Sequence, residues 1–411
     1  DWSSDVCSSD LFRMPVEPVK FLNEQDLANL DVYEYHGGEY SFLDNLLNPF
    51  WLKVAYSFPT WFAPNLITLS GLIINITAAL LLAINDPMML GEAPGWMYIN
   101  AAICLQIYAI FDAADGKQAR RLNASSPLGQ IFDHGCDAVN LIFIIVSSLC
   151  GVGLGSGKTT AWVIVVMCTA FVAAQLVEYQ SQILVTGSKF FGVTEAMLIV
   201  SIMLTLTGLF GVDIWTIDLR DVVPALKDVT TSLSVKYIVA AAMIIIIGLT
   251  MVVVGVSSLI HPSSIPMEKR GNKNLDRGSY VMRYIPVFII GVCAVIVLRS
   301  SLMVEYPLYV IFLVGLTYSF LSIRVNVSHL CRRRLGYSFG GMYPLCVLTV
   351  CHSFNLVRDA VTVPVCFCVF MILYVSFVIT TINQIKEHLH IRAFHVTAKT
   401  DRSEERRVGK E

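Results

Sequence analysis

Long apolar runs separated by short polar stretches recur along most of the chain. A membrane-spanning helix needs roughly 20 mainly apolar residues, and about ten runs approach or exceed that length. They occupy residues 66–84, 97–114, 128–150, 160–177, 193–212, 235–260, 284–298, 306–323, 341–355 and 363–382. The seventh and ninth runs are the shortest, so the count lies between eight and ten. The pattern predicts an all-α, polytopic integral membrane protein with about ten transmembrane helices.

A different pattern precedes the first run, over residues 41–61. Apolar side chains recur there at intervals of three and four, with polar ones between them. The apolar positions are Leu43, Leu46, Leu47, Phe50, Trp51 and Val54, and the polar ones are Asp44, Asn48 and Lys53. This spacing predicts an amphipathic helix that lies in the membrane interface, where Trp51 and Trp61 suit the headgroup zone.

Composition agrees with a membrane location. Hydrophobic residues make up 55% of the 411 residues and charged residues only 15%, which is too little polar surface to cover a water-soluble globule of this size. The formal net charge is −2, so the chain lacks the basic field that a nucleic-acid-binding protein uses. We therefore expect membrane lipids and no nucleic acid among its partners.

The two ends of the sequence read differently from the rest. Residues 1–11 and 402–411 correspond, codon for codon, to the two arms of a sequencing-library adapter, so we expect the native chain to occupy 12–401. Within it we predict four parts. These are an N-terminal part with the interfacial helix (12–62), a catalytic group of helices (63–212), additional transmembrane helices (213–383) and a C-terminal tail (384–401).

Basic residues lie mostly in loops on one side of the predicted spans. They include Lys117, Arg120 and Arg121 after the second span and the run 332–334 after the eighth. Positively charged loops remain in the cytosol, and these loops share a side with both ends of the chain. The sequence therefore predicts that the N-terminal part and the C-terminal tail are cytosolic.

Four aspartates gather at the second and third spans. Asp112 and Asp115 end the second span, and Asp133 and Asp137 begin the third. Helical spacings of three and four place each pair on one face, and the short connection brings the two helices together as antiparallel neighbours. Because carboxylates so close together repel each other, we expect two divalent ions, or one ion with basic partners, to neutralise them. Oxygen ligands of this kind suit Mg²⁺, Mn²⁺ or Ca²⁺.

The connection between these spans adds groups that bind phosphate. Lys117, Arg120 and Arg121 supply positive charge, and Gly116 allows close approach of a ligand to the backbone. Acids, a divalent metal and arginine together describe a phosphate or pyrophosphate site. The alternative at this point is a metal-free network of salt bridges between the aspartates and the two arginines.

Intramembrane acids also mark ion-coupled transporters, which is the rival function. A transporter predicts acids near the middle of the membrane on broken helices, together with internal repeats. Here the acids cluster at one end of two spans, and no repeat is evident.

The spacing of the acids also matches a known family. The order Asp112-x2-Asp115-Gly116-x2-Ala119-Arg120-x8-Gly129-x3-Asp133-x3-Asp137 resembles, without a gap or mismatch, the signature of the CDP-alcohol phosphatidyltransferase family. The length and the number of spans are similar to those of its eukaryotic choline/ethanolamine phosphotransferase branch. Residues 63–68, 192–195 and 383–391 also resemble that branch.

The resemblance implies an activity and a location. Such enzymes transfer phosphocholine or phosphoethanolamine from CDP-choline or CDP-ethanolamine to diacylglycerol, which gives phosphatidylcholine or phosphatidylethanolamine and CMP. It also implies two Mg²⁺ (or Mn²⁺) ions, a homodimer, and an endoplasmic reticulum or Golgi membrane with the active site on the cytosolic side. It does not distinguish choline from ethanolamine.

The resemblance further implies roles for individual residues. The metal ligands are Asp112, Asp115, Asp133 and Asp137, and the catalytic residues are His134, Asp133 and Asp137. His134 is the expected base that takes the diacylglycerol proton. The expected substrate-binding residues are Asn65, Tyr108, Asp112, Gly116, Lys117, Ala119, Arg120, Gly129, Gln130, Glu178 and Glu195. Glu178 is expected to help receive the headgroup, and Tyr108 to offer an aromatic face to a quaternary ammonium.

One position departs from the family pattern. Similar enzymes usually carry glutamate where this chain has Gln130, one helical turn before His134. An amide orients an imidazole ring but supplies no negative charge. We therefore expect a weaker base or a shifted pH optimum.

Overall fold

The computed structural model describes residues 20–33, 41–181, 191–223, 227, 234–260 and 282–396. Residues 1–11 and 402–411, which we expect to derive from adapter arms, lie outside these ranges. Within the described residues the chain is all-α, with a single isolated β-bridge between Asp218 and Ser234 and no β-strand. The all-α, polytopic membrane architecture expected from the apolar runs is therefore confirmed.

Each predicted apolar run coincides with helical structure. The helices before the midpoint are α1 (Glu24–Leu30), α2 (Phe42–Ser57), α3 (Pro64–Asn85), α4 (Gly95–Arg121), α5 (Pro127–Val152), α6 (Lys158–Ser181) and α7 (Val193–Phe210). Those after it are α8 (Asp213–Thr216), α9 (Leu219–Val222), α10 (Val235–Ile260), α12 (Ile285–Leu298), α13 (Leu302–Glu305), α14 (Pro307–Leu330), η2 (Gly340–Met342), α15 (Tyr343–Ser353) and α16 (Asp359–Leu389). The helix predicted within 41–61 is α2.

Seven helices of the described chain are long and apolar enough to cross a membrane. They are α3, α4, α5, α6, α7, α14 and α16. Helices α12 and α15 are shorter, with 14 and 11 residues. Helix α16 has 31 residues, which at 1.5 Å per residue is about 46 Å and exceeds a hydrocarbon core of about 30 Å. Its last turns therefore extend beyond the core.

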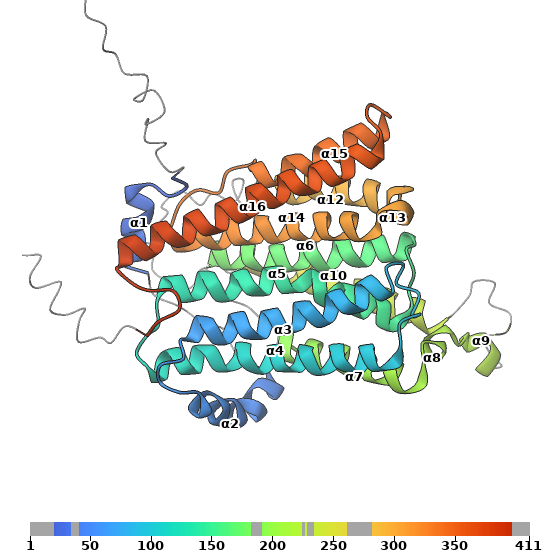
Figure 1. Ribbon diagram of the computed structural model, residues 1–411, viewed down its shortest axis with the longest axis horizontal. Coiled ribbons are helices and arrows are strands. Elements are labelled where there is room, and N and C mark those ends of the chain that lie inside the picture. The colour runs from blue at the N-terminus through green and yellow to red at the C-terminus, as the bar shows by residue number, and fades with distance from the viewer. Residues whose placement is uncertain are drawn as a thin grey trace, which may run out of the picture.

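In Figure 1 the long helices follow one another in the order α4, α3, α5, α6, α14 and α16, and the shorter α15 packs against α16. Helix α14 is the most enclosed, with 83% of its apolar window buried, whereas only 28% of the α16 window is buried. Helix α3 packs against both α4 and α5. The two acid-bearing helices are therefore linked by α3 as well as by the short connection between them.

Hydrogen bonds between polar side chains join the helices inside the bundle. Asn75 on α3 donates to Asn140 on α5 at 2.7 Å, and Ser319 on α14 pairs with Tyr374 on α16 at 2.9 Å. In an apolar environment such bonds hold helices in register, because neither group has water as an alternative partner. They fix the relative positions of the helices that carry the site.

The N-terminal helix α1 is attached to one end of this bundle, the same end where α16 finishes (Figure 1). Gln384 on α16 accepts from the backbone N–H groups of Phe21 and Leu22 at 2.9 and 3.2 Å. Asn29 on α1 donates to the carbonyl of Cys331 at 2.7 Å, and Arg333 donates to Asp26 at 3.2 Å. The two ends of the described chain thus meet beside the C-terminal end of α14.

Close contact between α5 and α14 depends on Gly315. A Cβ added to Gly315 would lie 2.3 Å from the side chain of Ile142, so even alanine forces the two helices apart. We expect Gly315→Ala to lower the free energy of unfolding by about 1–3 kcal/mol, measured as the thermal midpoint of the purified protein in detergent. Gly248→Ala on α10 is the matched control, since its added Cβ meets no described atom within 4 Å. Equal thermal midpoints for the two variants would contradict this packing.

Candidate functional site

Three of the four predicted acids converge on one point between α4 and α5. Asp133 and Asp137 are one helical turn apart on α5 and share a face, and Asp112 faces them from α4. One carboxylate oxygen from each residue lies within 4.8 Å of those of the other two. We call these three residues the acid triad.

The acid triad has unsatisfied oxygens. Asp112 Oδ1 and Asp133 Oδ1 are buried and accept no hydrogen bond from any described group. Within the described chain, no lysine or arginine forms an ion pair with the triad. A buried carboxylate oxygen without a donor is costly, and the alternative of a salt-bridge network with Arg120 and Arg121 is not seen in the described chain. The geometry and the hard oxygen donors therefore fit a divalent cation such as Mg²⁺ or Mn²⁺.

Neighbouring hydroxyls support the acids. The Tyr108 hydroxyl donates to Asp137 Oδ1 at 2.5 Å, and Thr68 on α3 donates to Asp115 Oδ2. Asp115 is not part of the acid triad, which is defined by the 4.8 Å limit between carboxylate oxygens. Asp115 and Asp133 both line the adjoining cavity. The spacing predicted that four acids converge. In the structure three of them meet at one point, and the fourth, Asp115, is held at the cavity wall by Thr68 of α3.

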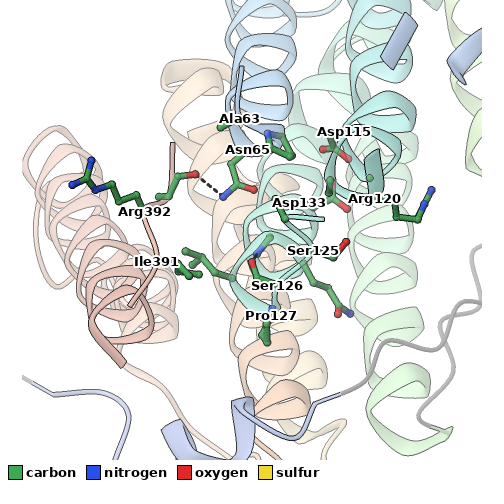
Figure 2. A pocket seen from close by; sticks show the side chains of 18 of the residues that line it. Ala63, Asn65, Asp115, Arg120, Ser125, Ser126, Pro127, Asp133, Ile391 and Arg392 are labelled. Carbon is green, nitrogen blue, oxygen red and sulfur yellow. Dashed lines mark hydrogen bonds between the residues drawn. The ribbon is translucent and has the colours of Figure 1, made fainter. Parts of the chain in front are cut away.

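A cavity of about 340 Å³ opens next to the acids. Figure 2 shows Asp115, Asp133 and Arg120 on one side, Ile391 and Arg392 opposite, and Asn65 between them. Its wall comes from the ends of α3, α4 and α5, from the 124–126 connection, from Tyr33 after α1 and from the segment after α16. That segment contributes Ile391, Arg392, Ala393 and His395.

The electrostatics of this cavity favour an anion. The N-terminal turns of α3 and α5 both line it, and exposed N–H groups at a helix N-terminus attract negative charge. Local sequence builds these ends: Pro64 and Pro127 occupy first-turn positions, and the Ser126 hydroxyl caps α5 by accepting from Gly129 N–H at 3.2 Å. Arg120 adds a full positive charge. The cavity can hold phosphate groups beside the metal-binding acids.

Gly116 and Gly129 keep the cavity open. A Cβ at Gly116 would meet only the Arg120 guanidinium, at 3.8 Å, and one at Gly129 would approach Ser126 Oγ and Asn65 Oδ1 at 3.6 and 3.7 Å. Neither position is closed by packing between helices. Both leave room that a ligand can fill.

His134 lines the same cavity, but its surroundings differ from the expectation. Its Nδ1 is buried and lies 3.9 Å from Glu178 Oε2 on α6, without a hydrogen bond. Gln130 lies on the same side and donates to Glu178 Oε1 at 3.4 Å. The carboxylate nearest to the imidazole therefore comes from a different helix.

The predicted substrate-binding residues fall into two groups. The cavity is lined by Asn65, Gly116, Ala119, Arg120, Gly129 and Gln130, whereas Tyr108, Asp112, Lys117, Glu178 and Glu195 do not line it. Lys117 lies over the Trp51 ring, and Glu195 accepts from the N–H groups of Gly192 and Leu43, which ties α7 to α2. The substrate roles of both groups stay predictions.

Sequence reasoning missed several residues that support the acids or line the cavity. The side chain of Thr68 is neither acidic nor basic, and the sequence pointed to it only as part of the stretch 63–68, which resembles the family. Tyr33 and the segment after α16 reach the cavity through the folding back of both chain ends, where Asn65 Nδ2 donates to the Ala393 carbonyl at 2.9 Å. The hydrophobic periodicity of a sequence does not indicate contacts between residues so far apart along the chain.

Comparison with known proteins gives a consistent result. The profile of the CDP-alcohol phosphatidyltransferase family matches residues 61–255. Choline/ethanolaminephosphotransferase 1 of Arabidopsis thaliana is 30% identical over 398 residues, covering 92% of this chain and 99% of the relative. Cholinephosphotransferase 1 of Gallus gallus is 37% identical over 197 residues, or 47% of this chain and 58% of the relative. Choline/ethanolaminephosphotransferase 1 of Saccharomyces cerevisiae is 36% identical over 192 residues, or 46% and 49%.

The support that Tyr108 gives to the acid triad can be tested without substrate. Tyr108→Phe removes the only hydroxyl that donates to Asp137 in the described chain. We expect the Mn²⁺ concentration for half-maximal thermal stabilisation to rise roughly 10–100-fold. Tyr309→Phe, at a half-exposed tyrosine on α14, is the control and keeps the parent's response. An unchanged Mn²⁺ response in Tyr108→Phe would contradict this role.

Proposed function

Because this chain belongs to the CDP-alcohol phosphatidyltransferase family, we propose that it transfers phosphocholine or phosphoethanolamine from the CDP-alcohol to diacylglycerol. The products are phosphatidylcholine or phosphatidylethanolamine and CMP. The full-length relative from Arabidopsis thaliana carries this pair of headgroups in its name. None of the relatives reported above is named as a transporter, and no observation on the described residues favours transport.

The acids and the cavity suit the binding of the CDP-alcohol. The acid triad and Asp115 would hold two Mg²⁺ or Mn²⁺ ions, which stabilise the attacking and leaving oxygens when bound. Arg120 and the N-terminal turns of α3 and α5 face the diphosphate and offset its charge. Asn65 borders the cavity between its two walls and is placed to orient the nucleotide.

His134 is the base in this reaction. The oxygen of the diacylglycerol hydroxyl forms a bond to the phosphorus that carries the alcohol headgroup, while the bond from that phosphorus to the bridging oxygen breaks. The bridging oxygen leaves with CMP, and His134 accepts the hydroxyl proton. The histidine lines the cavity next to Asp133, so the proton acceptor lies beside the bound phosphates.

Membrane position follows from the same proposal. Diacylglycerol is a membrane lipid and the CDP-alcohol is water-soluble, so the site must lie where the bilayer meets water. The acids lie at one end of α4 and α5, on the side with the basic loops. We propose that this end faces the cytosol from an endoplasmic reticulum or Golgi membrane. A homodimer stays a prediction from the resemblance.

The observation that carries the proposal is the acid triad with its two unsatisfied oxygens beside an anion-binding cavity. Full-length protein in vesicles that contain diacylglycerol should convert labelled CDP-choline or CDP-ethanolamine into labelled phospholipid in the presence of Mg²⁺. We expect Asp133→Asn to lower kcat by about 10²–10³-fold, and Asp213→Asn, at an exposed position outside the bundle core, to match the parent. The proposal fails if the parent forms no labelled phospholipid or if Asp133→Asn retains full activity.

A further inference from the structure

A group of four side chains, three of them buried, adjoins the cavity that His134 and Gln130 line. It consists of Glu178 on α6, His134 and Gln130 on α5, and His329 on α14. Building on the transferase function, we propose that Glu178 is the residue that positions His134, and that His329 from the C-terminal helices holds Glu178 in place. This differs from the headgroup contact that the sequence suggested for Glu178.

Glu178 is enclosed, and its partners are few. Its side chain is 4% exposed, and Oε2 lies 3.9 Å from His134 Nδ1 while Oε1 lies 3.7 Å from His329 Nε2. Both imidazoles are buried as well. Within the described chain, no lysine or arginine lies within ion-pair distance of this carboxylate. A buried carboxylate needs donors, and the available ones are the Gln130 amide and the two imidazoles.

This arrangement assigns the two nitrogens of the His134 ring. Nδ1 is buried on the Glu178 side, and His134 is one of the residues that line the cavity. We infer that its other nitrogen, Nε2, is the one directed into the cavity. A hydrogen on Nδ1, directed at Glu178, leaves the Nε2 lone pair free to accept a proton from the substrate. At 3.9 Å the contact is longer than a hydrogen bond, and catalytic contacts of this kind often shorten when substrate binds.

Gln130 and Glu178 form a complementary pair. Gln130 lies one turn before His134 on the same helix face, and its amide donates to Glu178 Oε1 at 3.4 Å. A glutamate at position 130 would instead face the Glu178 carboxylate, with repulsion between two buried negative charges. The structure thus accounts for the departure at position 130: the negative charge beside the imidazole comes from α6, and the amide satisfies it.

His329 links this group to the second half of the protein. It belongs to α14, outside the 61–255 region matched by the family profile. Its Nε2 also lies 3.5 Å from the hydroxyl of Tyr33, which lines the cavity. The helices that follow the matched region therefore do more than cover the catalytic ones, because they contribute a side chain to the support of the base.

The first test replaces the carboxylate with its amide. We expect Glu178→Gln to lower kcat on the order of 10²-fold, with the KM for the CDP-alcohol changed by less than about threefold, because the cavity wall is left intact. Glu92→Gln is the matched control, since Glu92 is exposed in the loop between α3 and α4. A raised KM with kcat unchanged would show a headgroup contact and overturn the proposal.

The second test moves the charge to the other member of the pair. In the double variant Gln130→Glu/Glu178→Gln the carboxylate and the amide exchange places. The carboxylate near His134 then comes from position 130, one turn before it on α5. We expect kcat to recover at least tenfold over Glu178→Gln, whereas Gln130→Glu alone, with two facing carboxylates, falls below the parent. A role for Glu178 in stability alone predicts no recovery in the double variant.

The third test addresses α14. We expect His329→Gln, which keeps a donor of similar reach, to retain more activity than His329→Leu, which leaves the Glu178 carboxylate short of one donor. His352→Leu on α15, where the imidazole pairs with Asp359 outside this group, serves as the control. An inactive parent overturns the transferase function itself. An active parent with unchanged kcat in both Glu178→Gln and His329→Leu overturns only the present proposal.

Discussion

The mutual repulsion of buried carboxylates is the constraint on which the architecture depends. Asp112, Asp133 and Asp137 meet inside an apolar bundle where no described basic side chain neutralises them. In a medium of low polarity, a cation between the oxygens would stabilise that arrangement. Helices α4 and α5 must therefore be held together against repulsion, and α3 does so by packing on both. A cation that binds these oxygens would therefore also stabilise the packing of α4 against α5.

The site has two parts, one within the helix bundle and one at the helix ends. The acids and His134 sit on helices fixed by buried contacts such as Asn75 with Asn140. The groups that suit the soluble substrate lie at helix ends, where Arg120 and the first turns of α3 and α5 reach water. A lipid hydroxyl and a nucleotide can thus meet at one point without either leaving its own phase.

The sequence predicted those features that depend on residues close together along the chain. Apolar runs of about 20 residues located the helices, and the four-residue spacing of Asp133 and Asp137 placed them on one face. The position of Asp115 depends on Thr68 from another helix, and the partner of His134 is 44 positions away on α6. Such pairings follow from tertiary packing, which a single sequence does not encode in any periodic pattern. Position 130 was identified as unusual, but its explanation required the neighbouring helix.

The bond from Asn65 to the carbonyl of Ala393 spans nearly the whole chain. It joins the entrance of the first spanning helix to the segment after the last one, and Ile391 and His395 complete the cavity wall. During synthesis the acid-bearing helices enter the membrane long before that segment is translated. A nascent chain that has not yet reached this segment therefore lacks part of the cavity wall. Completion of the cavity wall thus depends on residues that are translated long after the acids beside it.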